Sequence, residues 1–144
     1  MAVLHLKIIT PQKIALEEDV LSVTAPSAQG EITVLPQHSN LFTLLKEGIV
    51  KIKPVYAKVP EDKEKYLAIG GGYLETDGEE INILVSRAYG QDEIDAEKTQ
   101  KAIDEAQKTI SLAKDESQRK QAISLLRRSV LNLKLMKRKK RPSS

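Results

Sequence analysis

The sequence predicts a β-sandwich followed by an antiparallel two-helix hairpin, and three observations support this prediction. All seven glycines lie within residues 1–90, and none lies within residues 91–144. Apolar residues alternate with polar ones in the first segment, as in strands, and recur every three or four positions in the second, as in helices. Nine Lys and Arg against twelve Asp and Glu give a charge of −3 over residues 1–90, whereas fourteen against eight give +6 over residues 91–144. We therefore expect two domains, 1–90 and 91–144, with different partners.

The strands of the first domain are predicted from the alternation. Near the N-terminus, Leu4, Leu6 and Ile8 alternate with His5 and Lys7, which places His5 on the outer face of a half-buried strand. The same period recurs in two further segments, Leu21 to Ala25 and Ile81 to Val85. Short strands separated by turns about every ten residues indicate an antiparallel sandwich or barrel.

Glycine-containing segments supply the turns between these strands. The Asp-Gly pair at 77–78 predicts a two-residue hairpin turn, because glycine adopts the positive φ that such a turn requires. Further turns are predicted at 27–30 and 46–48, and a solvent-exposed hairpin tip at the polar segment 60–65. The three glycines at 70–72 lack the ending of a phosphate-binding loop and precede a strand. We interpret them as a bulge or a close approach within a sheet.

Two helices are predicted after Gly90, each with one apolar stripe. The first stripe comprises Ala96, Thr99, Ile103, Ala106, Ile110 and Ala113, and the second comprises Ile123, Leu126, Val130 and Leu133. Asp92 is expected to cap the first helix, and Asp115 with Gln118 resembles a capping box at the start of the second. Such narrow stripes bury little apolar surface, so the hairpin must dock on another surface or change conformation readily.

Catalytic chemistry has little support in the sequence. The absence of Cys excludes disulfides, thiolate metal sites and Cys nucleophiles. The two histidines, His5 and His38, lack metal-ligand spacing, and His38 is expected in a turn. Aromatic residues make up only 3%, which argues against the stacking of single-stranded nucleic-acid bases. We therefore expect no catalytic residue and no metal site, and a small hydrolase is disfavoured.

The strongest functional signal is a basic C-terminal segment. Six Lys and Arg lie within residues 134–141, and Arg127 and Arg128 precede them in the same predicted helix. Such a cluster suits a solvated face that complements the negative helix C-terminus, an acidic protein partner, a nucleic acid or anionic lipid. An acidic protein partner is favoured over nucleic acid, because no nucleic-acid-binding motif and no stacking aromatics accompany the charges.

Several segments resemble the epsilon subunit of bacterial F-type ATP synthase. They are GEITVLPQH at 30–38 with Leu41, Thr43 and Gly48 after it, Thr10-Pro11, the segments 70–75 and 81–85, and LLRRS at 125–129. The resemblance covers nearly the whole chain in order. It implies a noncatalytic central-stalk, or rotor, subunit of a proton-translocating ATP synthase, with a β-sandwich followed by a helical hairpin.

The resemblance also implies partners. The sandwich is expected to dock on the gamma subunit and the membrane c-ring, with Glu31 and His38 as polar contacts. The hairpin is expected to fold on the sandwich or to extend along the shaft, where it blocks ATP hydrolysis. Arg127 and Arg128 would then meet acidic loops of the alpha/beta catalytic subunits. The expected location is peripheral, at the cytoplasmic face of the cell membrane.

A regulatory nucleotide is implied as well. Some bacterial members of the family bind ATP at the folded hairpin through the motif I/L-D-x-x-R-A. Here Ile94 and Asp95 match, whereas Lys98 replaces Arg and Thr99 replaces Ala. Lys keeps the charge but lacks the planar fork that holds phosphate at two points. Asp95 alternatively fits an acid in the first turn of a helix. No cofactor is required.

A protein of another class provides the alternative interpretation. The N-terminal apolar run is interrupted by His5 and Lys7, so we expect no targeting segment. No stretch approaches the roughly 20 apolar residues of a transmembrane helix. A small free-standing adaptor that binds nucleic acid through its basic C-terminal helices would share these features.

Overall fold

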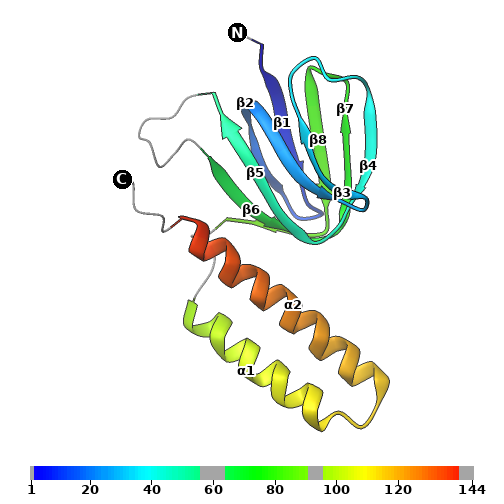
Figure 1. Ribbon diagram of the computed structural model, residues 1–144, viewed down its shortest axis with the longest axis vertical. Coiled ribbons are helices and arrows are strands. Elements are labelled where there is room, and N and C mark those ends of the chain that lie inside the picture. Colours follow the sequence, from blue (N-terminus) through cyan, green and yellow to red (C-terminus); the bar gives the residue numbers. More distant parts are fainter. Residues whose placement is uncertain (1, 56–63, 91–95, 140–144) are drawn as a thin grey trace. The chain divides into compact units, whose positions relative to one another are not determined.

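The computed structural model describes residues 2–55, 64–90 and 96–139 (Figure 1). The chain divides into two compact units, residues 1–90 and residues 91–141. The described strands all belong to the first unit and the described helices to the second. The predicted fold class, a β-sandwich followed by a two-helix hairpin, is confirmed.

The described part of the first unit contains nine strands. They are β1 (Leu4–Ile9), β2 (Ile14–Ser27), β3 (Gly30–Val34), β4 (Leu41–Leu45), β5 (Gly48–Pro54), β6 (Lys65–Ile69), β7 (Gly72–Thr76), β8 (Glu80–Val85) and β9 (Ala88–Tyr89). β5 and β6 pair antiparallel on either side of the predicted hairpin tip. Most of that tip lies outside the described residues.

The strands are hydrogen-bonded in the order β1-β8-β7-β4-β2-β5-β6-β9, and β3 pairs with β2. β1 also pairs with β2, so β2 has four partners along its 14 residues: β1, β3, β4 and β5. The pairing of β1 with β8 is parallel, whereas the sequence predicted antiparallel strands throughout. These two strands come from opposite ends of the sandwich sequence, so no hairpin sets their relative direction.

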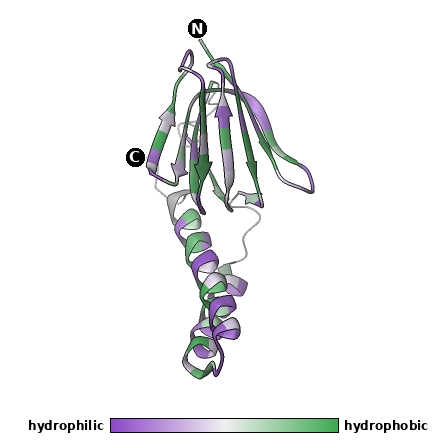
Figure 2. Cartoon of the chain, turned by 90° about the vertical axis from the view of Figure 1, so that its right-hand side faces the viewer, coloured by the Kyte–Doolittle hydropathy of each residue, from purple (hydrophilic) through white to green (hydrophobic). Residues whose placement is uncertain are grey.

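Inward-facing residues of the alternating strands form the sandwich core. Leu4, Leu6 and Ile8 of β1 are fully buried, as are Ile81 and Ile83 of β8. Figure 2 shows hydrophobic and hydrophilic residues alternating along the strands. Each fully buried Leu or Ile stabilises the fold by roughly 1.5–3 kcal/mol relative to an exposed one. The alternation therefore predicted this part of the core correctly, and the sandwich has a substantial core of its own.

Gly72 stands where two strands leave no room for a side chain. A Cβ at this position would overlap the backbone carbonyl of Leu84 on β8, which is the neighbour of β7. At Gly71, by contrast, the nearest atom to such a Cβ is the carbonyl oxygen of Leu45 at 3.7 Å, an ordinary contact. The close approach expected at the glycine run is confirmed at Gly72.

The predicted hairpin turn joins β7 to β8, but three residues rather than two separate the strands. Gly78 has a φ of 93°, as its place in the turn requires. The Asp77 Oδ1 atom accepts hydrogen bonds from the backbone N–H groups of Glu80 at 2.8 Å and Glu79 at 2.9 Å. Both hydrogen bonds lower the pKa of Asp77, and the bond from Glu80 has the larger effect. The Asp77 side chain thus accepts hydrogen bonds within the turn, as a backbone carbonyl would, and so stabilises it.

The second unit consists of α1 (Ala96–Leu112) and α2 (Glu116–Lys139), which pack against each other. Asp115 is the N-cap of α2, as predicted: its Oδ1 atom accepts a hydrogen bond of 2.7 Å from the backbone N–H of Gln118. Asp92, the expected cap of α1, lies outside the described residues.

The buried stripes of the two helices differ from the prediction. In α1, Thr99, Ile103 and Ala106 are buried as expected, but Ala96 is exposed. In α2, Ile123 and Val130 are 38% and 37% exposed, and the residues one position earlier, Ala122 and Ser129, are buried instead. Leu126 and Leu133, which are half-buried, fit the spacing of both versions of the stripe, so sequence spacing alone does not separate the two versions. Small side chains at the centre of the stripe allow close packing, while the larger β-branched ones lie at its edge.

Candidate interaction surfaces

One row of side chains crosses the outer face of five neighbouring strands. Successive register partners place Leu44, Tyr73, Leu84, Ile9 and Ile14 side by side on β4, β7, β8, β1 and β2. We call this row the apolar band. Its two ends are the most open, with Leu44 60% exposed and Ile14 53% exposed. An apolar row of this length on a solvent-facing sheet is typical of an interaction site.

An aromatic pair widens the band. Phe42 is 62% exposed, and its ring centroid lies 5.1 Å from that of Tyr73, which is diagonal to it on the adjacent strand. Diagonal neighbours in an antiparallel pair are within reach of aromatic side chains. Sequence reasoning missed these residues as a site. The available signal was the run LFTLL at 41–45, where both faces of the strand are apolar and the usual alternation is absent.

A shallow hollow of about 340 Å³ lies beside the aromatic pair. Its lining includes the apolar residues Leu41 and Phe42 and the acidic residues Glu75, Asp77 and Glu80. The outer face therefore joins an apolar area to an acidic one. This arrangement fits a protein surface with apolar and basic residues better than it fits a nucleic acid, whose phosphates the carboxylates would repel.

The structure separates the two polar contacts expected on the sandwich. Glu31 is exposed in the β2–β3 hairpin, where it pairs with Pro26 close to the C-terminal end of β4. His38 lies in the β3–β4 loop, near the N-terminal end of β4 (Figure 1). Glu31 and His38 therefore lie at opposite ends of the sandwich and are not two residues of one site.

The loop that contains His38 is held against the β7–β8 turn. The backbone N–H of Gln37 donates a 2.8 Å hydrogen bond to the carbonyl of Gly78, and Gln37 has a φ of 67°. The Nδ1 atom of His38 lies 2.7 Å from the carbonyl oxygen of Ser39. His38 thus has the turn role expected for it, at the same end of the sheet as the acidic hollow.

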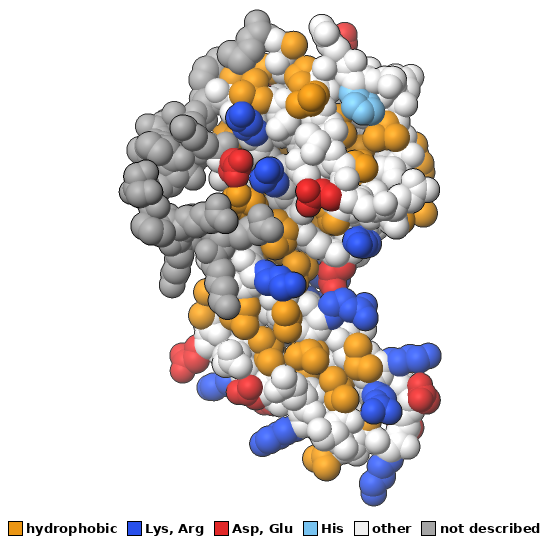
Figure 3. All heavy atoms as spheres, in the orientation of Figure 1, with side chains coloured by type: hydrophobic (Ala, Val, Ile, Leu, Met, Phe, Trp, Pro, Cys, Tyr) orange, Lys and Arg blue, Asp and Glu red, His pale blue; other side chains and the backbone are white. Residues whose placement is uncertain are grey.

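The predicted residues of the hairpin are exposed where they are described. Arg127 and Arg128 are both exposed on α2, and Lys98 is exposed in the first turn of α1. Ile94 and Asp95 lie outside the described residues, so the expected ATP motif stays a prediction. Figure 3 shows Lys and Arg side chains distributed over the helical unit, with apolar side chains between them.

The hairpin also exposes large apolar residues. Leu112 is 76% exposed and Leu125 38% exposed, in addition to Ile123 and Val130. Neither α1 nor α2, as far as they are described, is long and apolar enough to cross a membrane. Within the described ranges, no group of three or more His, Asp or Glu residues is arranged to hold a metal ion.

A sandwich with an exposed apolar band and a basic, amphipathic hairpin is typical of an interaction subunit, and comparison with known proteins gives its family. Residues 3–91 match the model of the ATP synthase delta/epsilon chain β-sandwich domain. The chain therefore belongs to the epsilon chain family of ATP synthases, whose members are structural stalk subunits and not the catalytic subunit.

Relatives of similar length support this assignment beyond the sandwich. The ATP synthase epsilon chain of Moorella thermoacetica is 35% identical over 134 residues, which cover 93% of this chain and 96% of the relative. That of Carboxydothermus hydrogenoformans is 33% identical over 108 residues, covering 75% of this chain and 76% of the relative. The match to the first of these relatives extends through most of the helical hairpin.

Solved structures agree with the same assignment. A chain in the Euglena gracilis mitochondrial ATP synthase (OSCP/F1/c-ring) matches with a TM-score of 0.69 and 25% identity, covering 95% of this chain and 79% of that one. A chain in the central stalk/c-ring of the Tetrahymena thermophila enzyme shares the fold, with a TM-score of 0.55, 16% identity and coverage of 92% and 96%.

Proposed function

We propose that this chain is the central-stalk rotor subunit of an F-type proton-translocating ATP synthase, which couples c-ring rotation to the catalytic head and regulates ATP hydrolysis through its hairpin. The observation that carries the proposal is the apolar band with its Phe42–Tyr73 pair, an apolar sheet face with exposed large residues in a chain of this family. A rotor subunit must bind the shaft through a rigid surface, and a strand face with fixed register is such a surface.

We assign the gamma subunit as the partner of the apolar band. We assign the c-ring as the partner of the end of the sandwich where Glu31 lies. His38 and the acidic hollow lie at one end of β4 and would form the polar rim of the gamma contact. Glu31, exposed in the β2–β3 hairpin, would contact the c-ring. This division follows from the separation of the two residues along the sandwich.

A binding assay with the gamma subunit tests the docking surface. We expect Phe42→Ala and Leu44→Ala each to weaken binding about tenfold or more, the loss that corresponds to about 1.4 kcal/mol. Lys53→Ala on β5 is the matched control, because Lys53 is also exposed on a strand but lies outside the band. Unchanged affinity in both band variants, with each variant folded, would contradict this surface.

We assign the hairpin to regulation through its exposed basic residues. In the extended hairpin, Arg127 and Arg128 would meet acidic loops of the alpha/beta subunits and so hinder ATP hydrolysis. Their exposure and the +6 charge of residues 91–144 support this role. The subunit would then act as a peripheral protein at the cytoplasmic face of the cell membrane.

ATP is proposed as a regulatory ligand of the hairpin, held by Ile94, Asp95 and Lys98. Calorimetric titration of the full chain with ATP tests this, with Asp95→Ala and Lys98→Ala expected to remove the binding signal. Lys101→Ala, at another exposed position of α1, is the control. No heat of binding at millimolar ATP would exclude the ligand while leaving the stalk assignment intact.

A further inference from the structure

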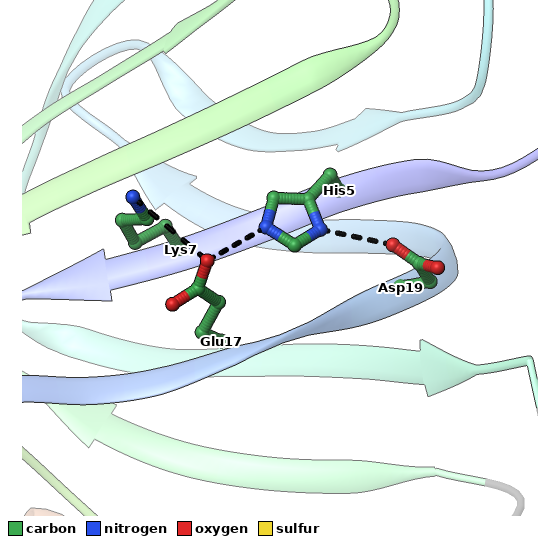
Figure 4. A network of polar contacts seen from close by, with 4 residues as sticks. All are labelled: His5, Lys7, Glu17 and Asp19. Atoms are coloured by element: carbon green, nitrogen blue, oxygen red, sulfur yellow. Dashed lines mark hydrogen bonds and ion pairs between the residues drawn. The ribbon is translucent and has the colours of Figure 1, made fainter.

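His5 lies between two carboxylates of the neighbouring strand (Figure 4). Its Nδ1 atom is 2.9 Å from Oδ1 of Asp19, and its Nε2 atom is 2.9 Å from Oε2 of Glu17. The Nζ atom of Lys7 lies 3.8 Å from the same Glu17 oxygen. We call these four residues the His5 cluster.

The pairing of β1 with β2 explains why the cluster forms. His5 is the register partner of Asp19, and Lys7 is that of Glu17, so His5 also reaches Glu17 diagonally. The alternation that buries Leu4 and Leu6 turns these polar residues outward. Each cation thus lies opposite an acid on the adjacent strand.

The geometry determines the charge of the ring. An ionised carboxylate only accepts hydrogen bonds, so a ring with a carboxylate at each nitrogen needs a proton on both. The neutral imidazole has one N–H and would turn a lone pair toward the second carboxylate. With the ring protonated, two positive and two negative charges balance within the cluster; without that proton, the cluster has one excess negative charge.

The strand on the other side of β1 adds no compensating positive charge. The register partner of His5 on β8 is Glu80, and the backbone N–H of His5 donates a 2.9 Å hydrogen bond to the carbonyl of Glu79. The charged residues that face His5 from β2 and β8 are therefore all acidic, and Lys7 on β1 itself is the nearby cation.

We propose that His5 is a proton-dependent bridge between β1 and β2, which makes the stability of the sandwich respond to pH in the neutral range. The bridge is intact when the ring is protonated and loses one of its two hydrogen bonds when the ring is neutral. Because His5 is 42% exposed, it exchanges its proton directly with solvent, and water screens the interaction so that the effect on stability is modest.

The direction of the pH effect follows from the two pKa shifts. The hydrogen bond to Asp19, and then that to Glu17, raise the pKa of His5 above its ordinary value of 6.5. The bridge therefore contributes fully to folding stability below pH 6.5. This contribution is lost as the pH rises through the pKa that His5 has in the folded protein. The hydrogen bond from His5, and then the charge of Lys7, lower the pKa of Glu17 below 4.5. The contribution of Glu17 to folding stability is lost as the pH falls through that lowered pKa.

NMR titration of the full chain tests the bridge directly. The chain has two histidines, so His38→Gln assigns their ring signals without ambiguity. We expect His5 to titrate above 6.5, and Asp19→Asn combined with Glu17→Gln to move its midpoint back toward 6.5. A wild-type midpoint at or below 6.5, or a midpoint that the double variant leaves unchanged, would overturn the proposal.

Chemical unfolding at a series of pH values tests the consequence for stability. The free energy of unfolding should decline from pH 6.5 upward in the wild type and in His38→Gln, and this decline should be lost in His5→Gln. The N-terminal amine also titrates in this range but is present in all three proteins. An identical pH dependence in His5→Gln and the wild type would refute the link between His5 and stability.

Discussion

The sandwich and the hairpin bury their apolar residues to very different extents. In the sandwich, large residues such as Ile52 and Leu74 are completely buried, and β1 and β2 are hydrogen-bonded on both sides. In the helices, the large buried residues are Ile103 and Leu135, and the others are small, such as Ala106 and Ala122, while Ile123 and Val130 are exposed. The sandwich therefore has a substantial core of its own, whereas the hairpin keeps apolar side chains available for another surface.

Separating the two units should produce the largest effect. We expect residues 1–90 to fold alone and unfold cooperatively, and residues 91–144 alone to lose most of their helicity, because a two-helix seam with few large buried residues does not offset the entropy of ordering. Circular dichroism of the two fragments measures this. A stable isolated hairpin would show that the hairpin does not need another surface to fold.

The same truncation tests regulation in the assembled enzyme. A complex reconstituted with residues 1–90 in place of the full chain should hydrolyse ATP faster, because the hairpin that we propose to be inhibitory is missing. If hydrolysis is unchanged while residues 1–90 still bind the gamma subunit, the inhibitory role is wrong and the docking role stands.

Gly72→Ala should damage the sandwich next most strongly. The added methyl group would overlap the carbonyl of Leu84, and the two strands would have to separate, at a cost of about 1–3 kcal/mol in unfolding free energy. Urea denaturation measures the loss. Gly71→Ala is the control, because it has room for a methyl group and should be tolerated. Equal effects at both positions would contradict the close approach of β7 and β8.

Asp115→Ala should have the smallest effect, confined to the hairpin. The substitution removes the acceptor of the Gln118 N–H and should destabilise the start of α2 by about 1 kcal/mol. Faster amide exchange in the first turn of α2 would report the change. Lys114→Ala, one residue earlier and exposed, should leave exchange unaltered. A loss of exchange protection in the sandwich core would show that the effect is not local.

Local patterns predicted most of the fold. Alternation identified the buried faces of β1 and β8, and the Asp-Gly pair located the β7–β8 turn, because both depend on neighbouring residues alone. The parallel pairing of β1 with β8 and the four partners of β2 depend on contacts between distant segments. No sequence period encodes such contacts, so they could not be predicted.

The candidate surfaces were predicted less completely. Arg127 and Arg128 lie on an exposed helix position that charge clustering identified. The apolar band was missed because its five members come from five strands and become neighbours only through register. His5 was placed on the outer face correctly, but its two carboxylate partners depend on the β1–β2 register, which the sequence does not reveal.

The length of β2 has a mechanical consequence. Its first part is hydrogen-bonded to β1, its last part to β3, and residues between Val20 and Thr24 to β5. A force applied to the outer face near β1 therefore reaches β5 along a continuous polypeptide backbone, and many backbone hydrogen bonds share it in shear. Sliding one layer over the other requires these bonds to break together. A strand shared in this way makes the sandwich stiff against twisting, a property that the proposed rotor role would require.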